Sequence, residues 1–483
     1  MRRALVLALA FATAGCAVGP NYQRPTTPTT AGFRGEARAE AASFADLPWW
    51  ELIRDPTLAA LVKEALERSY DLQDAVARME VARQTAKAST AALLPELGVS
   101  LGPSYQQVFL GSFSGLNAPG LPTGNLRYPS YLAQGSVSWD IDLWGRLRRL
   151  RESALAQFLA SEEHRRAVIV SLIGDVATGY FNLEALDLQL AIAHRTVASR
   201  EETLALFRNR EGGGVGSALD TASEEALLAG ARATIPSLER QIVQAEDQLS
   251  TLIGRPPGPI DRGLDLAHHP VPPEPPVGMP ASVLERRPDV RQAEALVISA
   301  NAQVGAAFAA LLPSLSFTGN VGVEGASLAH LFTGQALTFL ASGLLSDVLP
   351  LFNGAQKVYG WRGQQASYVS AVVAYRQTVL TALREVADAL VALKTYREAR
   401  TELEAQVAAQ VESVRLAKER FTAGVASYLD VVQAEQNLFP TELTLAQTIG
   451  AQFTALADLY RALGGGWQAS PASQASGSAL PGR

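Results

Sequence analysis

The sequence predicts a mainly α-helical fold built from two copies of one unit. Each copy consists of a helix, a β-hairpin, a long helix, a turn and a second helix. Three observations predict it: an internal repeat, long helical patterns without proline, and short stretches of alternating polarity. Residues 71–97 match residues 289–315 at an offset of 218, and residues 214–220 match residues 424–430 at an offset of 210. Two tandem copies of one supersecondary unit explain both matches.

The N-terminus predicts a secretory signal peptide at residues 1–15. Arg2 and Arg3 precede an apolar run that is too short for a membrane-spanning helix. The run ends at Cys16, the one cysteine of the chain, so no intrachain disulfide can form. The small residues before Cys16 resemble a bacterial lipobox, which predicts lipidation of Cys16, although Thr13 stands where Leu is usual. A plain signal peptide with an incidental cysteine is the alternative.

Residues 16–48 predict a lipid-anchored tether, because Pro and Thr are frequent after Cys16 and favour extended chain. Ala17 follows the cysteine where an inner-membrane retention signal would carry Asp. An outer membrane location is therefore favoured.

The composition excludes several classes of protein. A formal net charge of -6 and a pI of about 5.6 give no basic surplus for nucleic acid. The most apolar run after the signal, residues 295–312, aligns with a charged stretch of the first copy, so both are interpreted as amphipathic helices and no helical membrane span is expected. The five histidines and three methionines show no metal-ligand spacing, and the common catalytic motifs are absent. We therefore expect no enzyme activity, no metal and no cofactor other than lipid on Cys16.

The domain organisation follows from the repeat. The first copy covers residues 49–254 and the second residues 284–467; a proline-rich connector at 255–283 joins them, and a tail at 468–483 is expected to be disordered. Apolar residues recur at helical spacing in residues 146–210 and again in 355–421. About 65 helical residues at about 1.5 Å each span nearly 100 Å. Shorter helices are expected at 56–94, 217–252, 288–311 and 427–463.

Between the helices the period changes to two, which predicts hairpins at about 97–143 and 314–352. After Gly135 the odd positions are apolar and the even positions polar. The hairpins could form a small soluble sheet, or they could face lipid on one side and a water-filled lumen on the other. Four strands cannot close a barrel, and open edges in lipid leave backbone groups unpaired. Several chains would therefore share one barrel, with eight strands in a dimer or twelve in a trimer. The strand pattern alone does not distinguish a dimer from a trimer.

Four passages carry a family resemblance: residues 19–25 after Cys16, Trp49 and Trp50 with residues 55–58, residues 284–290, and residues 459–467. Together they resemble the TolC-like outer membrane factors of the NodT/OprM lipoprotein type. The resemblance implies a homotrimer whose twelve-stranded outer-membrane barrel continues into a periplasmic α-helical tunnel. It also implies contact with outer-membrane lipid, a periplasmic adaptor (a membrane fusion protein) and an inner-membrane pump of the RND type.

Two glycine-containing turns join the long helices to the returning ones. They comprise Gly214, Val215, Gly216 and Ser217 in the first copy and Gly424, Val425, Ala426 and Ser427 in the second. Glycine permits the chain reversal and serine can cap the next helix. A plain helix–helix turn is one interpretation; the resemblance implies that these tips also contact the adaptor. A dinucleotide site is excluded, because the glycines follow a helix and lack a βαβ setting.

Five residues just past the turns are candidates for a periplasmic gate: Asp220, Tyr428, Leu429, Asp430 and Gln433. Acids near a helix N-terminus are favoured by the helix dipole, which is the plain explanation of Asp220 and Asp430. In a ring of chains they could instead bind cations and set selectivity. Gln433 stands where related proteins often carry a second acid, so the gate is expected to depend more on packing of Tyr428 and Leu429.

Four arginines follow the second predicted strand: Arg146, Arg148, Arg149 and Arg151. They form either a solvated helix start or a contact with lipid headgroups.

The leading functional hypothesis is a passive conduit for efflux of drugs or other small molecules. One alternative is the outlet of a type I protein secretion system. A structural, lipid-anchored coiled-coil protein of the envelope is a third possibility, although a spacer needs no alternating hairpins such as residues 131–143.

Overall fold

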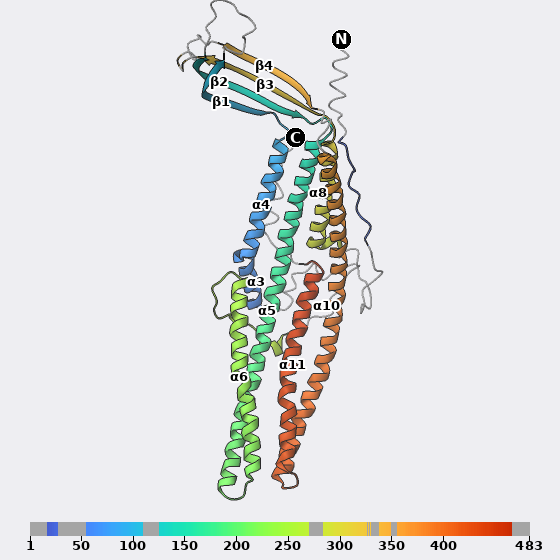
Figure 1. Ribbon diagram of the computed structural model, residues 1–483. Helices are drawn as coiled ribbons and strands as arrows, with labels where there is room; N and C mark the ends of the chain where they lie inside the picture. Colours follow the sequence, from blue (N-terminus) through green and yellow to red (C-terminus); the bar gives the residue numbers. More distant parts are fainter. Residues whose placement is uncertain are drawn as a thin grey trace, which may run out of the picture. The chain divides into compact units, whose positions relative to one another are not determined.

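The computed structural model describes residues 17–27, 55–109, 125–269, 284–325, 327, 329, 338–348 and 355–465 (Figure 1). The signal at 1–15, Cys16, Trp49, Trp50, most of the tether, residues 270–283 of the connector and the tail lie outside the described residues. The chain divides into two units. Unit 1 contains residues 1–25, 80–159 and 294–373, and unit 2 contains residues 26–79, 160–293 and 374–483. Each unit thus takes segments from both sequence copies.

Five of the six predicted helices are confirmed. The two long ones, α5 (Arg146–Gly212) and α10 (Gln356–Thr422), have 67 residues each. Helices α6 (Ala218–Leu252), α8 (Pro288–Ala309) and α11 (Tyr428–Ala462) account for three of the shorter ones. Among the described helices, none has both the length and the hydropathy that a membrane span requires.

The single helix expected at 56–94 is wrong, because the structure has two helices there. The chain forms α3 (Pro56–Arg68) and α4 (Tyr70–Ala91), because Ser69 between them has an extended ψ of 129°. The Arg68 carbonyl accepts a hydrogen bond from the Gln73 side chain at 3.1 Å. Gly254 packs so closely on the same carbonyl that a Cβ there would lie 2.5 Å from the oxygen. The break between α3 and α4 is therefore stabilised by the Gln73 side chain and by the turn at Gly254, which is distant in sequence but in contact with Arg68.

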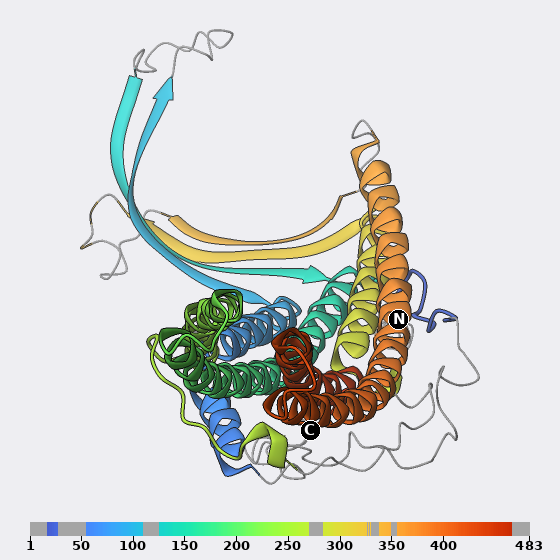
Figure 2. The same ribbon diagram turned by 90° about the horizontal axis from the view of Figure 1, so that it is seen from below.

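In unit 1 both predicted hairpins join one antiparallel sheet with the order β1–β2–β3–β4. The strands are β1 (Glu96–Phe109), β2 (Asn125–Ile141), β3 (Ser314–Gly325) and β4 (Thr338–Val348). The hairpins of the two copies meet where β2 pairs with β3. Seen from below, the strands are strongly curved (Figure 2). Within the described sheet, β1 and β4 are the edges.

The strand register separates polar from apolar residues. Leu97 pairs with Val137, and Val99 pairs with Gly135, which in turn pairs with Val321. Because side chains alternate along a strand, these residues share one face. The next row, in which Ser136 pairs with Asn320, lies on the opposite, polar face. The predicted alternation is thus confirmed across three strands.

The core of unit 2 is centred on aromatic residues of two helices. Tyr180 and Phe181 of α5 are fully buried, and the Phe181 ring stacks on Phe453 of α11 with centroids 5.0 Å apart. Part of the connector packs against this core: Ile260 is buried, as is Leu266 in the short helix η3 (Leu266–His268). The connector is therefore held to unit 2 along its described part.

Candidate functional site

The two tip turns, both in unit 2, have the same backbone conformation. Gly214 and Gly424 lie in the left-handed region, at φ 74° and 72°. In the first turn, the Val215 N–H donates to the Arg210 carbonyl at 3.0 Å; in the second, Val425 N–H donates to the Arg420 carbonyl at 3.0 Å. Each is a Schellman motif, which ends a helix by satisfying its last carbonyls through a left-handed residue. The predicted turns are confirmed.

The tips present apolar side chains to the surface and differ in two details. Val215 is 73% exposed and Val425 is 68% exposed. Ser217 caps α6 by accepting a hydrogen bond from the Leu219 N–H at 3.2 Å, whereas Ser427 makes no side-chain cap bond at α11. A Cβ at Gly216 would lie 2.6 Å from a backbone nitrogen, yet the equivalent position of the second copy is an alanine. The two turns are therefore similar but not equivalent surfaces.

The candidate gate residues take up different environments. Tyr428 is buried, with its ring 4.1 Å from Phe207 between centroids. Leu429, in contrast, is 60% exposed. Asp430 and Gln433 are exposed as well, and Asp220 is half-buried. Within one chain, Tyr428 thus packs among aromatic residues rather than on Leu429.

Sequence reasoning missed a group of buried charges behind the tips. Glu224 of α6 is fully buried and accepts a hydrogen bond from the Tyr428 hydroxyl at 2.6 Å. Glu435 of α11 is buried and pairs with Lys418 at 2.7 Å. Arg200 of α5 is also buried. Burial raises the pKa of Glu224, and burial together with the Glu224 hydrogen bond raises the pKa of Tyr428. This group contains side chains from all four helices behind the tips.

One signal for Glu224 was present in the sequence. Thr221, Glu224, Leu228 and Ala231 recur at spacings of three and four and are all buried on α6. Glu224 therefore lies on the inward stripe of the helix, whereas its neighbour Glu225 is exposed and pairs with Arg208.

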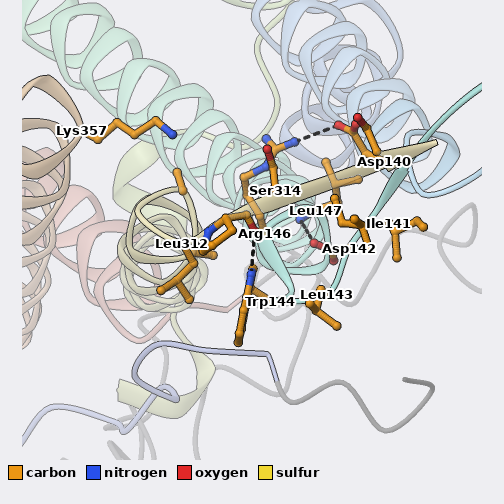
Figure 3. Close-up of a pocket in the computed structure, with 15 residues that line it drawn as sticks. Asp140, Ile141, Asp142, Leu143, Trp144, Arg146, Leu147, Leu312, Ser314 and Lys357 are labelled. Atoms are coloured by element: carbon orange, nitrogen blue, oxygen red, sulfur yellow. Dashed lines mark hydrogen bonds and ion pairs between the residues drawn. The ribbon is translucent and has the colours of Figure 1, made fainter. Parts of the chain in front are cut away.

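The base of the sheet in unit 1 contains a cavity of about 320 Å³ (Figure 3). Polar contacts organise its wall. The Arg146 guanidinium donates to Asp140 at 3.3 Å, the Leu147 N–H donates to the Asp142 carboxylate at 3.0 Å, and the Trp144 indole donates to the Pro313 carbonyl at 2.7 Å. Asp142 thus caps the start of α5.

The headgroup interpretation of the arginine cluster is wrong for Arg149. Arg149 is buried, donates to the Val18 carbonyl at 3.3 Å and donates to the Asn21 side chain at 2.8 Å. Arg148 is also engaged internally, with Asp142. Because these cations fasten the N-terminal segment and the helix start, Arg149 is not available to lipid.

The sequence profile of the family described as outer membrane efflux protein matches residues 61–255 and 279–465. The chain belongs to the outer membrane efflux protein family. The resemblance drawn from the sequence is thereby confirmed, and the family places the protein in the outer membrane.

Curated relatives of this outer membrane efflux protein match over nearly their whole length. It is 32% identical over 467 residues to the probable efflux pump outer membrane protein TtgC of Pseudomonas putida, covering 95% of this chain and 94% of the relative. It is also 32% identical over 475 residues to the outer membrane protein OprJ of Pseudomonas aeruginosa, covering 95% of each chain. The two matches therefore extend over nearly all of this chain and nearly all of each relative.

Solved structures show the same fold. The outer-membrane channel OprN matches with a TM-score of 0.85 at 28% identity, covering 94% of this chain and all of that one. The open state of the MtrE outer membrane channel of Neisseria gonorrhoeae matches with a TM-score of 0.80 at 32% identity, covering 94% and 99%. The efflux protein therefore has the fold of an outer membrane channel.

Proposed function

We propose that this protein is the outer membrane channel of a tripartite efflux system. Drugs or other small molecules pass through it passively, from a periplasmic adaptor and an RND-type inner-membrane pump to the exterior. The names of the relatives, which are efflux pump outer membrane proteins, support this proposal. The protein supplies a path and carries out no chemistry on its cargo.

The observation that carries the proposal is the open four-stranded sheet. Strands β1, β2 and β3 have one apolar and one polar face, and the edge strands β1 and β4 have no partner on their outer side within the described part of the chain. Unpaired strand edges cost several kcal/mol per backbone group in lipid, so neighbouring chains must supply the missing strands. Three chains would give a closed barrel of twelve strands. We therefore propose a homotrimer.

The tips are proposed to bind the adaptor. Each tip exposes a valine and a leucine one turn apart: Val215 with Leu219, which is 73% exposed, and Val425 with Leu429. Exposed apolar side chains that recur at two equivalent places favour a protein contact. We propose that the gate lies beside them and that Asp220, Asp430 and Gln433 would face neighbouring chains of the trimer. Within one chain, the hydrogen bond from the Tyr428 hydroxyl to Glu224 joins α11 of the second helical hairpin to α6 of the first.

Lipidation of Cys16 also remains a proposal. Cys16 lies outside the described residues, but Ala17 packs on Gly145, at the junction of β2 and α5. A Cβ on Gly145 would lie 2.7 Å from the Ala17 Cα. The residue that follows Cys16 thus packs beside the end of β2, which supports an anchor at the membrane end of the chain.

The deciding experiment replaces Ser427 by cysteine, since Cys16 is the one native cysteine and is expected to be acylated. Cross-linking in cells, followed by mass spectrometry, identifies the protein captured at the tip. Capture of an efflux-type adaptor supports the proposal. Capture of a secretion-type adaptor moves the function to protein export, and capture of no periplasmic partner favours a structural spacer. Cysteine at the exposed Tyr359, in unit 1, is the matched control.

A further inference from the structure

Three potential metal ligands converge in the interior of unit 2, although they are far apart in the sequence. Asp55 precedes α3, Glu184 lies within α5, and His269 directly follows η3 in the connector. Their side chains are 0%, 3% and 0% exposed. Sequence spacing gave no indication of a metal site, because each ligand comes from a different segment.

The distances between the donor atoms suit one small ion. His269 Nε2 lies 3.0 Å from Glu184 Oε2 and 3.6 Å from Asp55 Oδ2, and all three donors lie within 4.8 Å of one another. Zinc is bound tetrahedrally by His nitrogen and carboxylate oxygen at about 2.0–2.2 Å, which puts neighbouring donors about 3.3 Å apart. The 3.0 Å distance from His269 Nε2 to Glu184 is slightly shorter than this donor–donor spacing, and the 3.6 Å distance to Asp55 is slightly longer.

The charges at this site are not balanced by a permanent cation. Among the residues that the structure describes, His269 is the one cationic partner of either carboxylate. Burial raises the pKa of Glu184. Burial opposes protonation of His269, but the Glu184 hydrogen bond and the nearby carboxylates outweigh it and raise the imidazole pKa. A divalent cation would neutralise both carboxylates without requiring a proton.

One buried polar atom of the cluster, Glu184 Oε1, lacks a hydrogen-bond partner. Buried polar groups are rarely left unpaired, so such atoms call for an explanation. A metal ion held by both oxygens of Glu184 would satisfy Oε1 and complete four donors together with Asp55 and His269.

Surrounding groups hold the ligands in place. The Tyr180 hydroxyl donates to Asp55 Oδ2 at 2.8 Å and accepts a hydrogen bond from the Gly263 N–H at 2.9 Å. The other oxygen of Asp55 accepts from the Thr57 N–H at 2.7 Å. Hydrogen bonds of this kind orient ligating carboxylates in metalloproteins.

We propose that Asp55, Glu184 and His269 form a binding site for one divalent transition-metal ion of the zinc type. The imidazole disfavours magnesium and calcium, which prefer oxygen ligands alone. A bound ion would join the connector to α5 and to the start of α3. The role is structural, because the ligands are enclosed and the site lies among the core side chains of unit 2.

The test measures zinc binding by the full-length protein, purified without a histidine tag, stripped with EDTA and titrated with Zn²⁺. We expect one zinc per chain by elemental analysis and a rise in the thermal unfolding midpoint. His269→Ala abolishes both effects. The matched control His194→Ala, which removes an exposed histidine outside the cluster, leaves them unchanged. Tyr180→Phe keeps the ring but lowers zinc affinity about 10- to 100-fold, as loss of a supporting hydrogen bond does.

Two results would overturn the proposal. One is wild-type protein that binds no more zinc than His269→Ala does. If that variant does not fold, the corresponding result is wild-type protein that binds no zinc. The other is wild-type protein whose thermal unfolding midpoint does not change on addition of zinc, but whose stability falls as pH rises through the raised pKa of the His269 imidazole. That behaviour belongs to a protonated histidine paired with carboxylates, without a metal.

Discussion

The hydroxyl of Tyr428 offers the sharpest test of how the tip helices are held together. It donates to Glu224 at 2.6 Å, and both residues are buried. Tyr428→Phe removes the donor and keeps the ring, which packs on Phe207 at 4.1 Å and on Phe421 at 5.3 Å between centroids. The change therefore isolates one hydrogen bond between α11 and α6.

The magnitude follows from burial. Glu224 Oε1 already lacks a partner, so the variant leaves the whole carboxyl group without its Tyr428 donor. Losing a hydrogen bond to a charged, buried group costs about 1.5–3 kcal/mol. At 1.36 kcal/mol per tenfold change, local opening of the tip helices should increase roughly 10- to 150-fold.

Native-state hydrogen exchange of the backbone amides in α6 measures this opening. The matched control is Tyr359→Phe, which removes a hydroxyl from an exposed tyrosine of unit 1. We expect faster exchange near Glu224 in Tyr428→Phe and no change in the control. Equal exchange in both variants would show that the hydrogen bond contributes nothing to the packing of the tip.

The same contact predicts a pH dependence. Burial raises the pKa of Glu224 above that of an unfolded chain. A carboxyl group with a raised folded-state pKa stabilises the fold fully below its unfolded pKa, and this contribution is lost as pH rises through the folded value. Local opening at the tip should therefore slow on acidification, and Glu224→Gln should flatten that dependence.

Three further predictions concern the tips and the N-terminus. Asp220→Ala combined with Asp430→Ala should raise leak of large antibiotics; unchanged susceptibility of cells with assembled trimers would remove the gate role. Gly424→Ala should lower the free energy of unfolding by about 1–2 kcal/mol, because Gly424 has a left-handed conformation. Gly230→Ala, inside α6, should raise the free energy of unfolding by about 0.5–1 kcal/mol. Thermal unfolding midpoints that shift in the same direction in both variants would contradict this. Arg149→Ala should release the N-terminal segment, which limited proteolysis would detect as faster cleavage there.

Much of the fold could be predicted because its determinants are local. The proline-free periodicity of α5 and the alternation in β2 report directly on helix and strand. The break at Ser69 could not be predicted, because it depends on a contact with Gly254 far along the chain. The pairing of β2 with β3 likewise joins hairpins from different copies, which no local pattern specifies.

The candidate site likewise contains residues whose conformation could be predicted from the sequence and residues whose surroundings could not. Gly214 and Gly424 were predictable, since a left-handed turn after a helix selects glycine. The environment of Tyr428 was not, because its partner Glu224 comes from the other copy of the repeat. The meeting of Asp55, Glu184 and His269 depends on where the connector packs, which spacing along the chain does not encode.

The duplicated unit has a consequence for stoichiometry. In the proposed trimer, six tip turns would alternate around the ring between the type with Gly216 and the type with Ala426, so that the ring has threefold symmetry and only approximate sixfold symmetry. A substitution in one copy would change every second docking position and leave the others intact. A partner could therefore bind as six nearly equivalent subunits or as three that recognise a single type of turn. Mixed substitutions in the two copies would tell these arrangements apart.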